Sequence, residues 1–439
     1  MQNLYSEVTS LDQRAVSKFA LSEELMMEHA AASMAHYIRE HFPLTSSILI
    51  VCGNGNNGAD GRVLARQLDG DYRVSFQYQN DIHYDVIVDA LFGSGLNRGL
   101  DPAICELIDL LNSFNAFKIA CDVPSGLFAN GTLDPHTFKA DLTITMGGLK
   151  RSLFSDAAKE YVGEIRVATL GIARSRYEIP SAWRLLDPGD LSLPLRTQRS
   201  THKGSYGHLG VICGEKIGAS VIAGSAALRF GTGLVSLISN ENVTLPYELM
   251  QSHSLPSSTT AIAVGMGLGE EFGDDELAQL LDNVYPLVLD ADIFYHTLFS
   301  TLVMRKQIVL TPHPKEFTHI LRVCGIADID VATLQNDRFT YVERFCATYP
   351  NAVLLLKGAN VIIGTQERFF INPHGTVALA KGGSGDVLSG LIGALLAQGY
   401  EPVNAAIQAS LAHTLSAQKF DKNNYALTPY DIIEGITTL

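Results

Sequence analysis

The chain has 439 residues, of which 46% are hydrophobic and 18% charged, and its formal net charge is −14. This length exceeds a typical single domain, and the composition is that of a globular protein with large cores. The acidic balance argues against nucleic acid or an anionic membrane surface as the main partner. The six cysteines form no CxxC pair, which favours reduced thiols. No apolar run approaches the roughly 20 residues of a membrane span, and the first residues lack the features of a signal peptide. We therefore expect a cytoplasmic protein with no membrane partner.

Short apolar runs alternate with helical segments through the first part of the chain. Apolar residues recur at helical spacing over residues 11–39, and further helical stretches occupy 61–68 and 102–111. Strand-like runs lie at 48–52, 74–78, 86–91, 119–123 and 142–146. Buried runs that alternate with helices are typical of a mostly parallel sheet between two helical layers, a three-layer α/β sandwich.

A second series of the same kind follows a stretch with poor apolar periodicity. That stretch, residues 180–199, holds Pro180, Pro188, Gly189 and Pro194 and is interpreted as a linker. The later strand-like runs lie at 209–213, 234–238, 261–264, 287–289, 308–310, 353–356, 361–363 and 369–371. Two helices are expected near 386–398 and 403–419. The pattern thus predicts two α/β domains, residues 1–179 and 200–439.

A glycine- and asparagine-rich loop follows the first predicted strand. Residues 48–61 read ILIVCGNGNNGADG, so the strand enters a loop with Gly53, Gly55 and Gly58 and then a helix. Glycines let the backbone approach an anion, and the helix N-terminus adds partial positive charge. Amide oxygens of the neighbouring asparagines suit a ligand hydroxyl or a monovalent cation. The alternative is an asparagine-rich turn in left-handed conformation.

Two further strand ends carry polar groups. Asp89 begins the string DALFGSGLNRGL, and Asp122 begins DVPSG, which contains Ser125. In an open α/β sheet, residues just past the carboxyl ends of the strands line the ligand crevice. Each aspartate alone is as readily explained as a helix N-cap, but three such loops together predict a site.

These three strings resemble the signatures of the NAD(P)HX epimerase family over residues 1–175. The resemblance implies a Rossmann-like domain that interconverts the two C6 epimers of hydrated NADH and NADPH, with K⁺ in the site. It implies that Asn57, Asp89 and Ser125 bind K⁺ and that Asp122 is the acid/base next to the nicotinamide. The implied substrate-binding residues are Asn56, Asn57, Gly58, Ala59, Asp60, Gly93, Ser94, Gly95, Leu96, Asn97, Arg98, Gly99 and Asp122.

The N-terminal part of the chain departs from the family pattern in two places. Ala59 stands where the family usually has glycine, and the stretch between Leu68 and Asp85 is short. We expect a peripheral strand and helix to be missing there.

A second glycine loop lies near the C-terminus. Residues 381–390 read KGGSGDVLSG and precede an apolar helix. The N–H groups of Gly382, Gly383 and Gly385 at a helix start make an anion-binding site, and Asp386 adds a carboxylate. A base beside an anion site suits phosphoryl transfer to a hydroxyl. The alternative is a glycine-rich N-cap in which Asp386 only complements the helix dipole.

Five more segments accompany this loop, and together they resemble the ADP/ATP-dependent NAD(P)HX dehydratase family, a branch of the ribokinase-like fold, over residues 195–439. They are HKGSYGH from His202, GAS from Gly218, GMGLG from Gly265, TPHPKEF from Thr311 and LKGAN from Leu356. The resemblance implies that Asp386 is the base and that Ala219, Gly267 and His313, together with Asp386, face the hydrate. The implied ADP-binding residues are Lys357, Gly358, Ala359, Asn360, Val361 and Gly385. His313, between two prolines, could instead stabilise a turn.

The two resemblances on one chain predict a fused enzyme that repairs hydrated NADH and NADPH. The N-terminal domain would epimerise the R and S hydrates, and the C-terminal domain would dehydrate the S hydrate at the expense of ADP, rather than ATP, with Mg²⁺. The family resemblance also implies a homo-oligomer. The alternative is a ribokinase-like kinase for a vitamin precursor, joined to an N-terminal module that binds a ligand without turnover.

Overall fold

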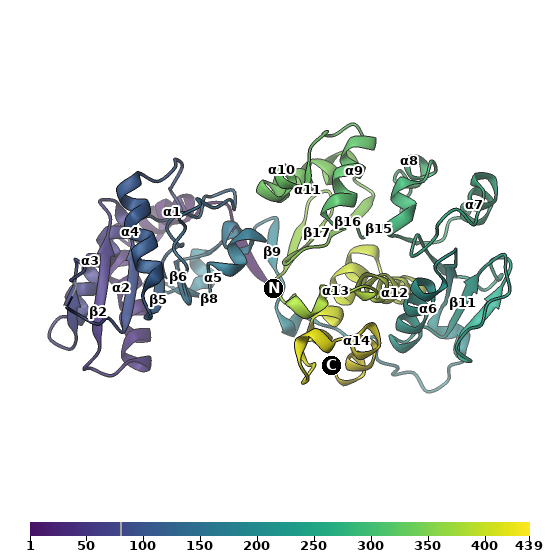
Figure 1. Cartoon of the computed structure of the whole chain (residues 1–439), viewed down its shortest axis with the longest axis horizontal. Helices are drawn as coiled ribbons and strands as arrows, with labels where there is room; N and C mark the ends of the chain where they lie inside the picture. Colours follow the sequence, from purple (N-terminus) through teal and green to yellow (C-terminus); the bar gives the residue numbers. More distant parts are fainter. Residues whose placement is uncertain (80) are drawn as a thin grey trace. The chain divides into compact units, whose positions relative to one another are not determined.

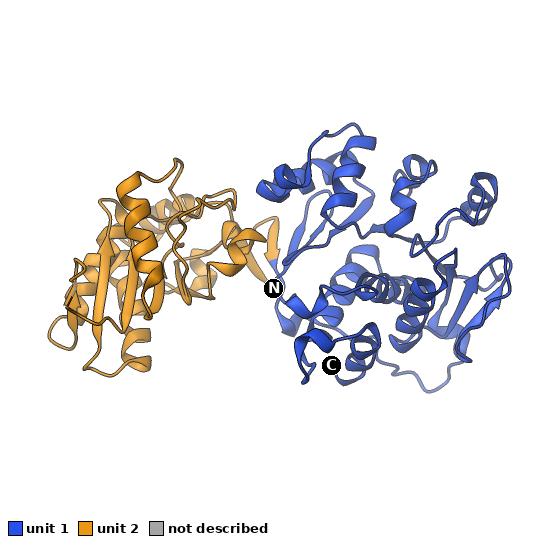
Figure 2. Cartoon of the chain, viewed as in Figure 1, with its two compact units in different colours: residues 1, 185–439 blue, residues 2–184 orange. Residues whose placement is uncertain are grey.

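A computed structural model describes residues 1–79 and 81–439. The chain divides into two compact units (Figure 2): the N-terminal unit is Gln2–Arg184, and the C-terminal unit is Leu185–Leu439 with Met1. The division falls within residues 180–199, which contain β9 (Trp183–Leu185) and the 3₁₀ turn η3 (Pro188–Asp190). Among the described residues, no helix is both long and apolar enough to cross a membrane.

The N-terminal unit is built on a six-stranded sheet of order β3-β2-β4-β5-β6-β8, in which every neighbouring pair is parallel. The strands are β2 (Ser47–Cys52), β3 (Arg73–Ser75), β4 (Val86–Ala90), β5 (Phe117–Cys121), β6 (Leu142–Met146) and β8 (Glu164–Ala168). A separate parallel pair joins β1 (Gln2–Tyr5) to β7 (Leu149–Lys150). The helices are α1 (Thr9–Phe19), α2 (Glu23–His41), α3 (Asn56–Leu68), α4 (Pro102–Ser113) and α5 (Arg174–Tyr177), with 3₁₀ turns η1 (Arg151–Phe154) and η2 (Ala157–Glu160).

Helices cover both faces of this sheet (Figure 1). The side chains of β2 alternate, so that Ile48 and Ile50 pack with α2 and α3 in one core cluster. Leu49 and Val51 pack with α4 in a second cluster. A strand buried on both faces accounts for the continuous apolar run in the sequence, and the predicted three-layer α/β sandwich is confirmed.

Two predicted elements of this unit differ in extent from the structure. Residues 11–39 form two helices rather than one, because Ala20 adopts a left-handed backbone with φ 54° and ends α1. Ser22 then caps α2, and its Oγ accepts a hydrogen bond from the Leu25 N–H at 3.3 Å. The strand predicted at 74–78 is only Arg73–Ser75.

The C-terminal unit has a larger sheet, in which the order β12-β11-β10-β13-β14-β15-β16-β17-β18 runs across the unit. Neighbours are parallel from β12 to β16, and β17 and β18 add an antiparallel hairpin. The strands are β10 (His208–Ile212), β11 (Leu234–Ile238), β12 (Met250–Ser252), β13 (Ala261–Val264), β14 (Leu287–Leu289), β15 (Ile308–Leu310), β16 (Ala352–Leu356), β17 (Val361–Gly364) and β18 (Phe369–Asn372).

The helices of the C-terminal unit pack around this sheet, and α12 (Ser384–Ala397) is the most buried of its long helices. The other helices are α6 (Ile217–Arg229), α7 (Asp274–Leu281), α8 (Phe299–Leu302), α9 (Pro314–Val323), α10 (Val331–Asn336), α11 (Arg338–Thr348), α13 (Pro402–Gln418) and α14 (Pro429–Gly435). In Figure 1, α12 lies beside α6 and α13. The fit with α6 is close, since a Cβ on Gly390 would stand 2.1 Å from the Ala223 carbonyl oxygen. This packing fixes the first turn of α12, which carries the predicted base.

We predict that Gly58→Ala destabilises the N-terminal unit, whereas Gly55→Ala does not. A Cβ on Gly58 would lie 1.9 Å from the Gly53 carbonyl oxygen, while a Cβ on Gly55 would meet no atom within 4 Å. Overpacking of this kind costs about 1–3 kcal/mol. Thermal or urea unfolding measures the difference, and equal stability of the two variants would contradict the close approach of α3 to its preceding loop.

Candidate functional site

A cavity of about 810 Å³ lies where β2, β4 and β5 end in the N-terminal unit. In the sheet, β3 lies on one side of β2 and β4 lies on the other. The chain therefore reverses its direction of travel across the sheet after β3, and the carboxyl ends of β2 and β4 flank this topological switch point. The structure brings together at this cavity most of the predicted substrate residues. They are Asn56, Asn57, Asp60, Gly93, Ser94, Gly95, Leu96, Asn97, Arg98 and Asp122.

Three other predicted residues, Gly58, Ala59 and Gly99, are described by the structure but do not line the cavity. Gly58 is buried where α3 approaches the Gly53 carbonyl oxygen, so it shapes the loop rather than the lining. Glycine at this position is explained by packing alone.

The three predicted K⁺ ligands, Asn57, Asp89 and Ser125, are all buried, but of these three only Asn57 lines the cavity. Asp89 is fully buried, and its two carboxylate oxygens accept hydrogen bonds from the Ser125 N–H and the Ser125 hydroxyl, each at 2.7 Å. A third bond comes from the Leu91 N–H at 3.1 Å. Burial raises the pKa of Asp89 to about 6 despite these bonds. Asp89 therefore ties the end of β4 to the turn after β5.

Asn57 differs from these two residues because it lines the cavity. Its side chain is only 7% exposed, and among the described residues neither the amide oxygen nor the amide nitrogen has a hydrogen-bond partner. A buried polar group without a partner is costly. Asn57 is therefore a group that a bound ligand or ion would satisfy.

Asp122 is held in a strained position by donors from four directions. Its backbone is left-handed with φ 70°, and one carboxylate oxygen accepts a bond from the Ser94 N–H at 3.1 Å. The other accepts from the Met146 N–H at 3.1 Å, from the Thr145 hydroxyl at 3.3 Å and from the Lys150 ammonium. Burial opposes ionisation, but Lys150 and these bonds lower the pKa of Asp122 below its ordinary value. Asp122 is therefore a carboxylate at neutral pH.

Sequence reasoning missed three charged residues of this cavity, Lys150, Asp12 and Asp101. Asp101 directly follows the string that begins at Asp89, whereas Lys150 and Asp12 are brought in from segments outside the three motifs. Asp12, on α1, accepts a hydrogen bond from the Tyr177 hydroxyl at 2.6 Å. The signal that could have found Lys150 is its place at the end of a short buried strand, since a buried lysine requires a partner.

The second site is the glycine loop at the start of α12 in the C-terminal unit. Gly383 precedes the helix with φ 88°, and a Cβ there would stand 2.5 Å from Pro429. Asp386 lies in the first turn, where burial, and then the charge of Asp290, raises its pKa to about 6. A base with that pKa is mostly ionised at neutral pH and can still accept a proton.

Asp290 connects this loop to the sheet. It follows β14, is 2% exposed, and accepts hydrogen bonds from the Lys357 ammonium at 2.7 Å and the Ser389 hydroxyl at 2.6 Å. Lys357 also lies over Gly385, since a Cβ on that glycine would be 3.3 Å from its Nζ. The structure thus places a cation over the glycine loop that the sequence predicted as an anion site.

The remaining predicted residues of this unit lie in several places. A Cβ on Gly267 would be 3.2 Å from the Ala219 Cβ, so these two predicted hydrate contacts adjoin each other. Lys357, Gly358, Ala359, Asn360 and Val361 form the β16–β17 turn and the start of β17.

His313 caps α9 and therefore has the structural role that the sequence left open. Its Nδ1 accepts a hydrogen bond from the Glu316 N–H at 3.2 Å, and the Glu316 carboxylate accepts from the His313 N–H at 2.8 Å. Burial and the charge of Lys357 lower the pKa of His313, while burial raises the pKa of Glu316 to about 7. The capping contacts use Nδ1 and the backbone of His313.

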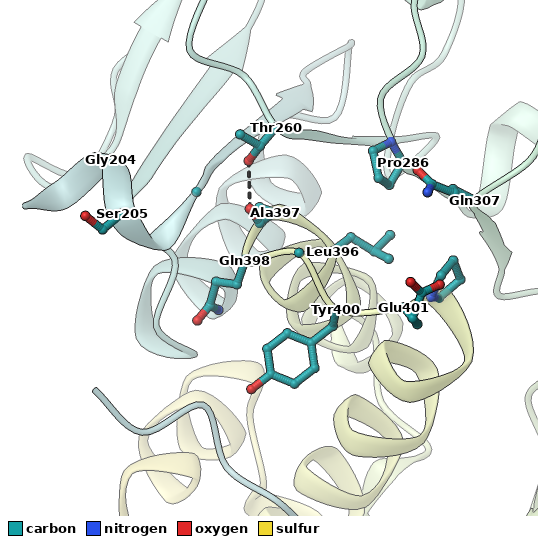
Figure 3. Close-up of a pocket in the computed structure, with 13 residues that line it drawn as sticks. Gly204, Ser205, Thr260, Pro286, Gln307, Leu396, Ala397, Gln398, Tyr400 and Glu401 are labelled. Atoms are coloured by element: carbon teal, nitrogen blue, oxygen red, sulfur yellow. Dashed lines mark hydrogen bonds between the residues drawn. The ribbon is translucent and has the colours of Figure 1, made fainter. Parts of the chain in front are cut away.

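A further cavity of about 370 Å³ lies at the amino ends of the strands of the C-terminal sheet, opposite the glycine loop (Figure 3). Thr260, Pro286 and Gln307 line it, and each directly precedes a strand, β13, β14 or β15. The Thr260 hydroxyl donates to the Ala397 carbonyl at 2.8 Å, at the C-terminal end of α12. None of the predicted site residues that the structure describes lines this cavity.

Two α/β units, each with glycine loops and buried carboxylates at the carboxyl ends of parallel strands, define a two-domain enzyme class that handles nucleotides. Comparison with known proteins identifies the family. The model for NAD(P)H-hydrate dehydratase matches residues 209–438, and the model for the YjeF-related protein N-terminus matches residues 23–83 and 73–152.

Curated relatives match along the whole chain. The bifunctional NAD(P)H-hydrate repair enzyme Nnr of Helicobacter pylori is 41% identical over 474 aligned residues, covering 100% of both chains. The protein of the same name from Escherichia coli is 32% identical and covers 90% of this chain and 84% of its own. The chain belongs to the bifunctional NAD(P)H-hydrate repair enzyme family. The family predicted from the sequence is thereby confirmed, and the vitamin-precursor kinase is not supported by these full-length relatives.

Among solved structures, the ADP/ATP-dependent NAD(P)H-hydrate dehydratase of Bacillus subtilis, co-crystallized with ATP/Mg²⁺, is 26% identical. The match covers 55% of the present chain and 92% of the Bacillus subtilis chain, with a TM-score of 0.47.

We predict that Asp290→Asn lowers the pKa of Asp386. The negative charge of Asp290 raises that pKa, and its loss also leaves the Lys357 charge uncompensated, which acts in the same direction. A ¹³C NMR titration of the aspartate carboxyls, assigned with Asp386→Asn, measures the shift. The exposed Asp282 provides the matched control, Asp282→Asn, which should leave the titration in place. An unchanged or raised pKa in Asp290→Asn would contradict this coupling.

Proposed function

We propose that the chain repairs hydrated NADH and NADPH in two steps, one in each unit. The N-terminal unit interconverts the R and S hydrates at C6, and the C-terminal unit dehydrates the S hydrate to NAD(P)H with ADP. The observation that carries this proposal is the presence of both sites on one chain that is 41% identical, end to end, to a bifunctional repair enzyme. We assign residues 1–179 to the epimerase domain, 180–199 to the linker and 200–439 to the dehydratase domain.

The residues around the N-terminal cavity support its role as the epimerase site. The loop from Gly93 to Gly99 and the start of α3 supply backbone N–H groups, which suit the phosphates of a dinucleotide. Asp122, a carboxylate whose oxygens face Ser94 and Lys150, is the proposed acid/base. The cavity volume of about 810 Å³ falls in the range typical of small-molecule sites.

The N-terminal unit also has residues that fit K⁺. Asn57 has an unsatisfied buried amide oxygen, and Asp89 and Ser125 supply further oxygens from two strand ends. One carboxylate among neutral oxygens suits a weakly hydrated monovalent ion better than Mg²⁺, which demands a tight octahedral shell. Among the described residues, no group of three or more His, Cys, Asp or Glu could hold a metal. Bound K⁺ would supply positive charge beside Asp89 and fix the Asn57 amide.

We predict that K⁺ stabilises the N-terminal unit and that Asn57→Ala abolishes this effect. An ion that binds only the folded state raises its stability by mass action, and replacing the Asn57 side chain removes no hydrogen bond to any residue that the structure describes. The melting temperature and the rate of epimerisation of the R hydrate are measured in K⁺ and in tetramethylammonium at equal ionic strength. Asn54→Ala, at an exposed position of the same loop, is the control and should retain the K⁺ effect. Identical stability and rate of the wild type in both buffers would refute the ion site.

The C-terminal unit supports phosphoryl transfer from ADP to the C6 hydroxyl. Hydroxide is a poor leaving group, and phosphorylation converts it to a good one. Asp386 takes the hydroxyl proton while the hydroxyl oxygen bonds to the β-phosphorus and AMP departs. The glycine N–H groups and Lys357 stabilise the transferred phosphoryl. Phosphate then leaves C6 as a proton is lost from C5, which restores the dihydronicotinamide ring.

Gly385 and the turn from Lys357 to Val361 are the proposed ADP-binding residues, and Ala219, Gly267 and His313 the proposed hydrate contacts. His313 has one ring nitrogen, Nε2, outside its capping bond, although this nitrogen lies 3.2 Å from the Glu316 carboxylate. Mg²⁺ would accompany ADP, because phosphoryl transfer enzymes use it to neutralise phosphate charge. We further propose a preference for ADP over ATP, a homo-oligomer and a cytoplasmic location; the six free cysteines support the last.

We predict that Asp386→Asn abolishes dehydration and leaves epimerisation intact. Loss of a positioned general base costs on the order of 10² to 10⁴ in rate, and the N-terminal site is untouched. Because the carboxylate is the active form, wild-type dehydration should rise with pH through about 6, the pKa of Asp386. Turnover is followed by NADH absorbance from the S hydrate with ADP, and nucleotide affinity by calorimetry. Dehydration by Asp386→Asn at the wild-type rate would refute the assignment of Asp386 as the base.

A further inference from the structure

Lys150 is a buried charge that the motif resemblance leaves without a role. It ends β7, and its side chain is almost entirely buried in the N-terminal unit. The ammonium donates to the Asp122 carboxylate and to the Met146 carbonyl at 2.8 Å. Lys150 also lines the cavity. A buried lysine is stable only with such partners, and its partner here is the proposed acid/base.

Asp60 is the second carboxyl of the cavity with an altered proton affinity. It lies on α3, three residues after Asn57, and is partly buried. Burial, and then the charge of Asp122, raises the pKa of Asp60 to about 7, while Lys150 opposes the rise. At neutral pH Asp60 is thus protonated in about half of the molecules, whereas Asp122 is ionised.

Other titratable and charged groups lie near these carboxyls. Asp12 on α1 raises the pKa of Asp60 further. Asp101 and Arg98 also line the cavity, so its lining holds four carboxyls against two cations. Other titratable groups near the pair include the Tyr177 hydroxyl, bonded to Asp12, the Asp89 carboxyl, and the Cys52 and Cys121 thiols, whose pKa values burial raises. This excess of carboxyls favours positive charge that develops on the reacting ring, while the loop N–H groups remain suited to the phosphates.

We propose that Asp60 and Asp122 form an acid–base pair that exchanges the C6 hydroxyl of the hydrate for water, with Lys150 as the positioning residue that keeps Asp122 the base. This inference rests on the proposed epimerase function of the same cavity. Two carboxyls whose surroundings separate their proton affinities are suited to opposite roles in one reaction. They come from different elements, α3 and the turn after β5.

The reaction proceeds in two balanced steps. The Asp60 carboxyl donates its proton to the C6 hydroxyl, the C6–O bond breaks, and water leaves while the lone pair of ring N1 forms a C6=N1 double bond. The carboxyl-rich lining stabilises the resulting cation. A second water then adds to the other face of C6, and Asp122 takes the proton that this water loses. The site is restored when the proton returns from Asp122 to Asp60 through solvent.

Lys150 is required because it sets the protonation state of Asp122. Without the ammonium, burial would raise the pKa of Asp122, so less of this carboxyl would be ionised to act as the base of the second step. The same change would raise the pKa of Asp60, since Lys150 holds it down. Removal of the Lys150 charge should therefore shift the pH–rate profile of epimerisation to higher pH.

The first experiment follows solvent oxygen during epimerisation by the full wild-type chain. Pure R hydrate is incubated in H₂¹⁸O without ADP, with an enzyme-free sample as control. The two epimers are then separated, and the ¹⁸O content of each is measured by mass spectrometry. We expect about one ¹⁸O in the product for each inversion. Inversion with retained ¹⁶O would overturn water exchange in favour of opening the ring at C6–N1. A complete lack of inversion would instead refute the epimerase function itself.

The second experiment compares the pH profiles of epimerisation for the wild type and Lys150→Met. The wild-type rate should be flat below pH 7 and fall above it, as Asp60 loses its proton. In Lys150→Met the rate at pH 7 should fall by on the order of 10² to 10⁴ and then rise with pH, and Lys150→Arg should restore part of it. The exposed Lys139 provides the control Lys139→Met, which should retain the wild-type profile. A lower rate with an unshifted profile would mean that Lys150 only supports the fold.

Asp60→Asn tests the acid and does not depend on the folding of the Lys150 variant. Its residual rate should lose the fall above pH 7, because the titrating carboxyl is gone. ADP-dependent dehydration of the S hydrate by the same preparation checks that the chain is intact. Epimerisation by Asp60→Asn at the wild-type rate, or with the wild-type fall above pH 7, would overturn the role of Asp60.

Discussion

A buried carboxylate at the end of a parallel strand is stable only when hydrogen-bond donors or a cation surround it, and both units of this chain depend on that requirement. Asp89 takes its donors from Ser125 and Leu91. Asp122 takes them from Lys150, Met146 and Ser94. The bonds from Ser125, Ser94, Met146 and Lys150 each join one strand end to another segment of the unit, and those to Asp122 lie at the cavity.

The C-terminal unit meets the same requirement with different residues. Asp290 after β14 is held by Lys357 and by Ser389 of α12. Because Ser389 lies one turn after Asp386, the bond to Asp290 also sets the position of the proposed base. The charge of Asp290 raises the pKa of Asp386, so one residue both orients the helix and adjusts the base.

The sequence predicted those parts of the fold and site that depend on local pattern. The doubly buried strands, such as Ser47–Cys52, are continuous apolar runs, and the glycine loop before Asp386 has its own spacing. Lys150 and Asp12 could not be placed in the same way, because they reach the cavity from β7 and α1, and only tertiary packing brings them to Asp122. Local backbone geometry was equally hidden, as the left-handed Ala20 that ends α1 has no glycine to signal it.

The central claim is that one chain carries both steps of the repair, and pure R hydrate tests it most directly. The wild-type chain is incubated with this hydrate, first without and then with ADP, and the R hydrate, S hydrate, NADH, AMP and phosphate are all quantified. We predict that without ADP the S hydrate accumulates and no NADH forms. Addition of ADP should then yield NADH, AMP and phosphate in equal amounts until both hydrates are consumed. R hydrate that remains unchanged in both conditions, or NADH that forms without AMP, would contradict the account.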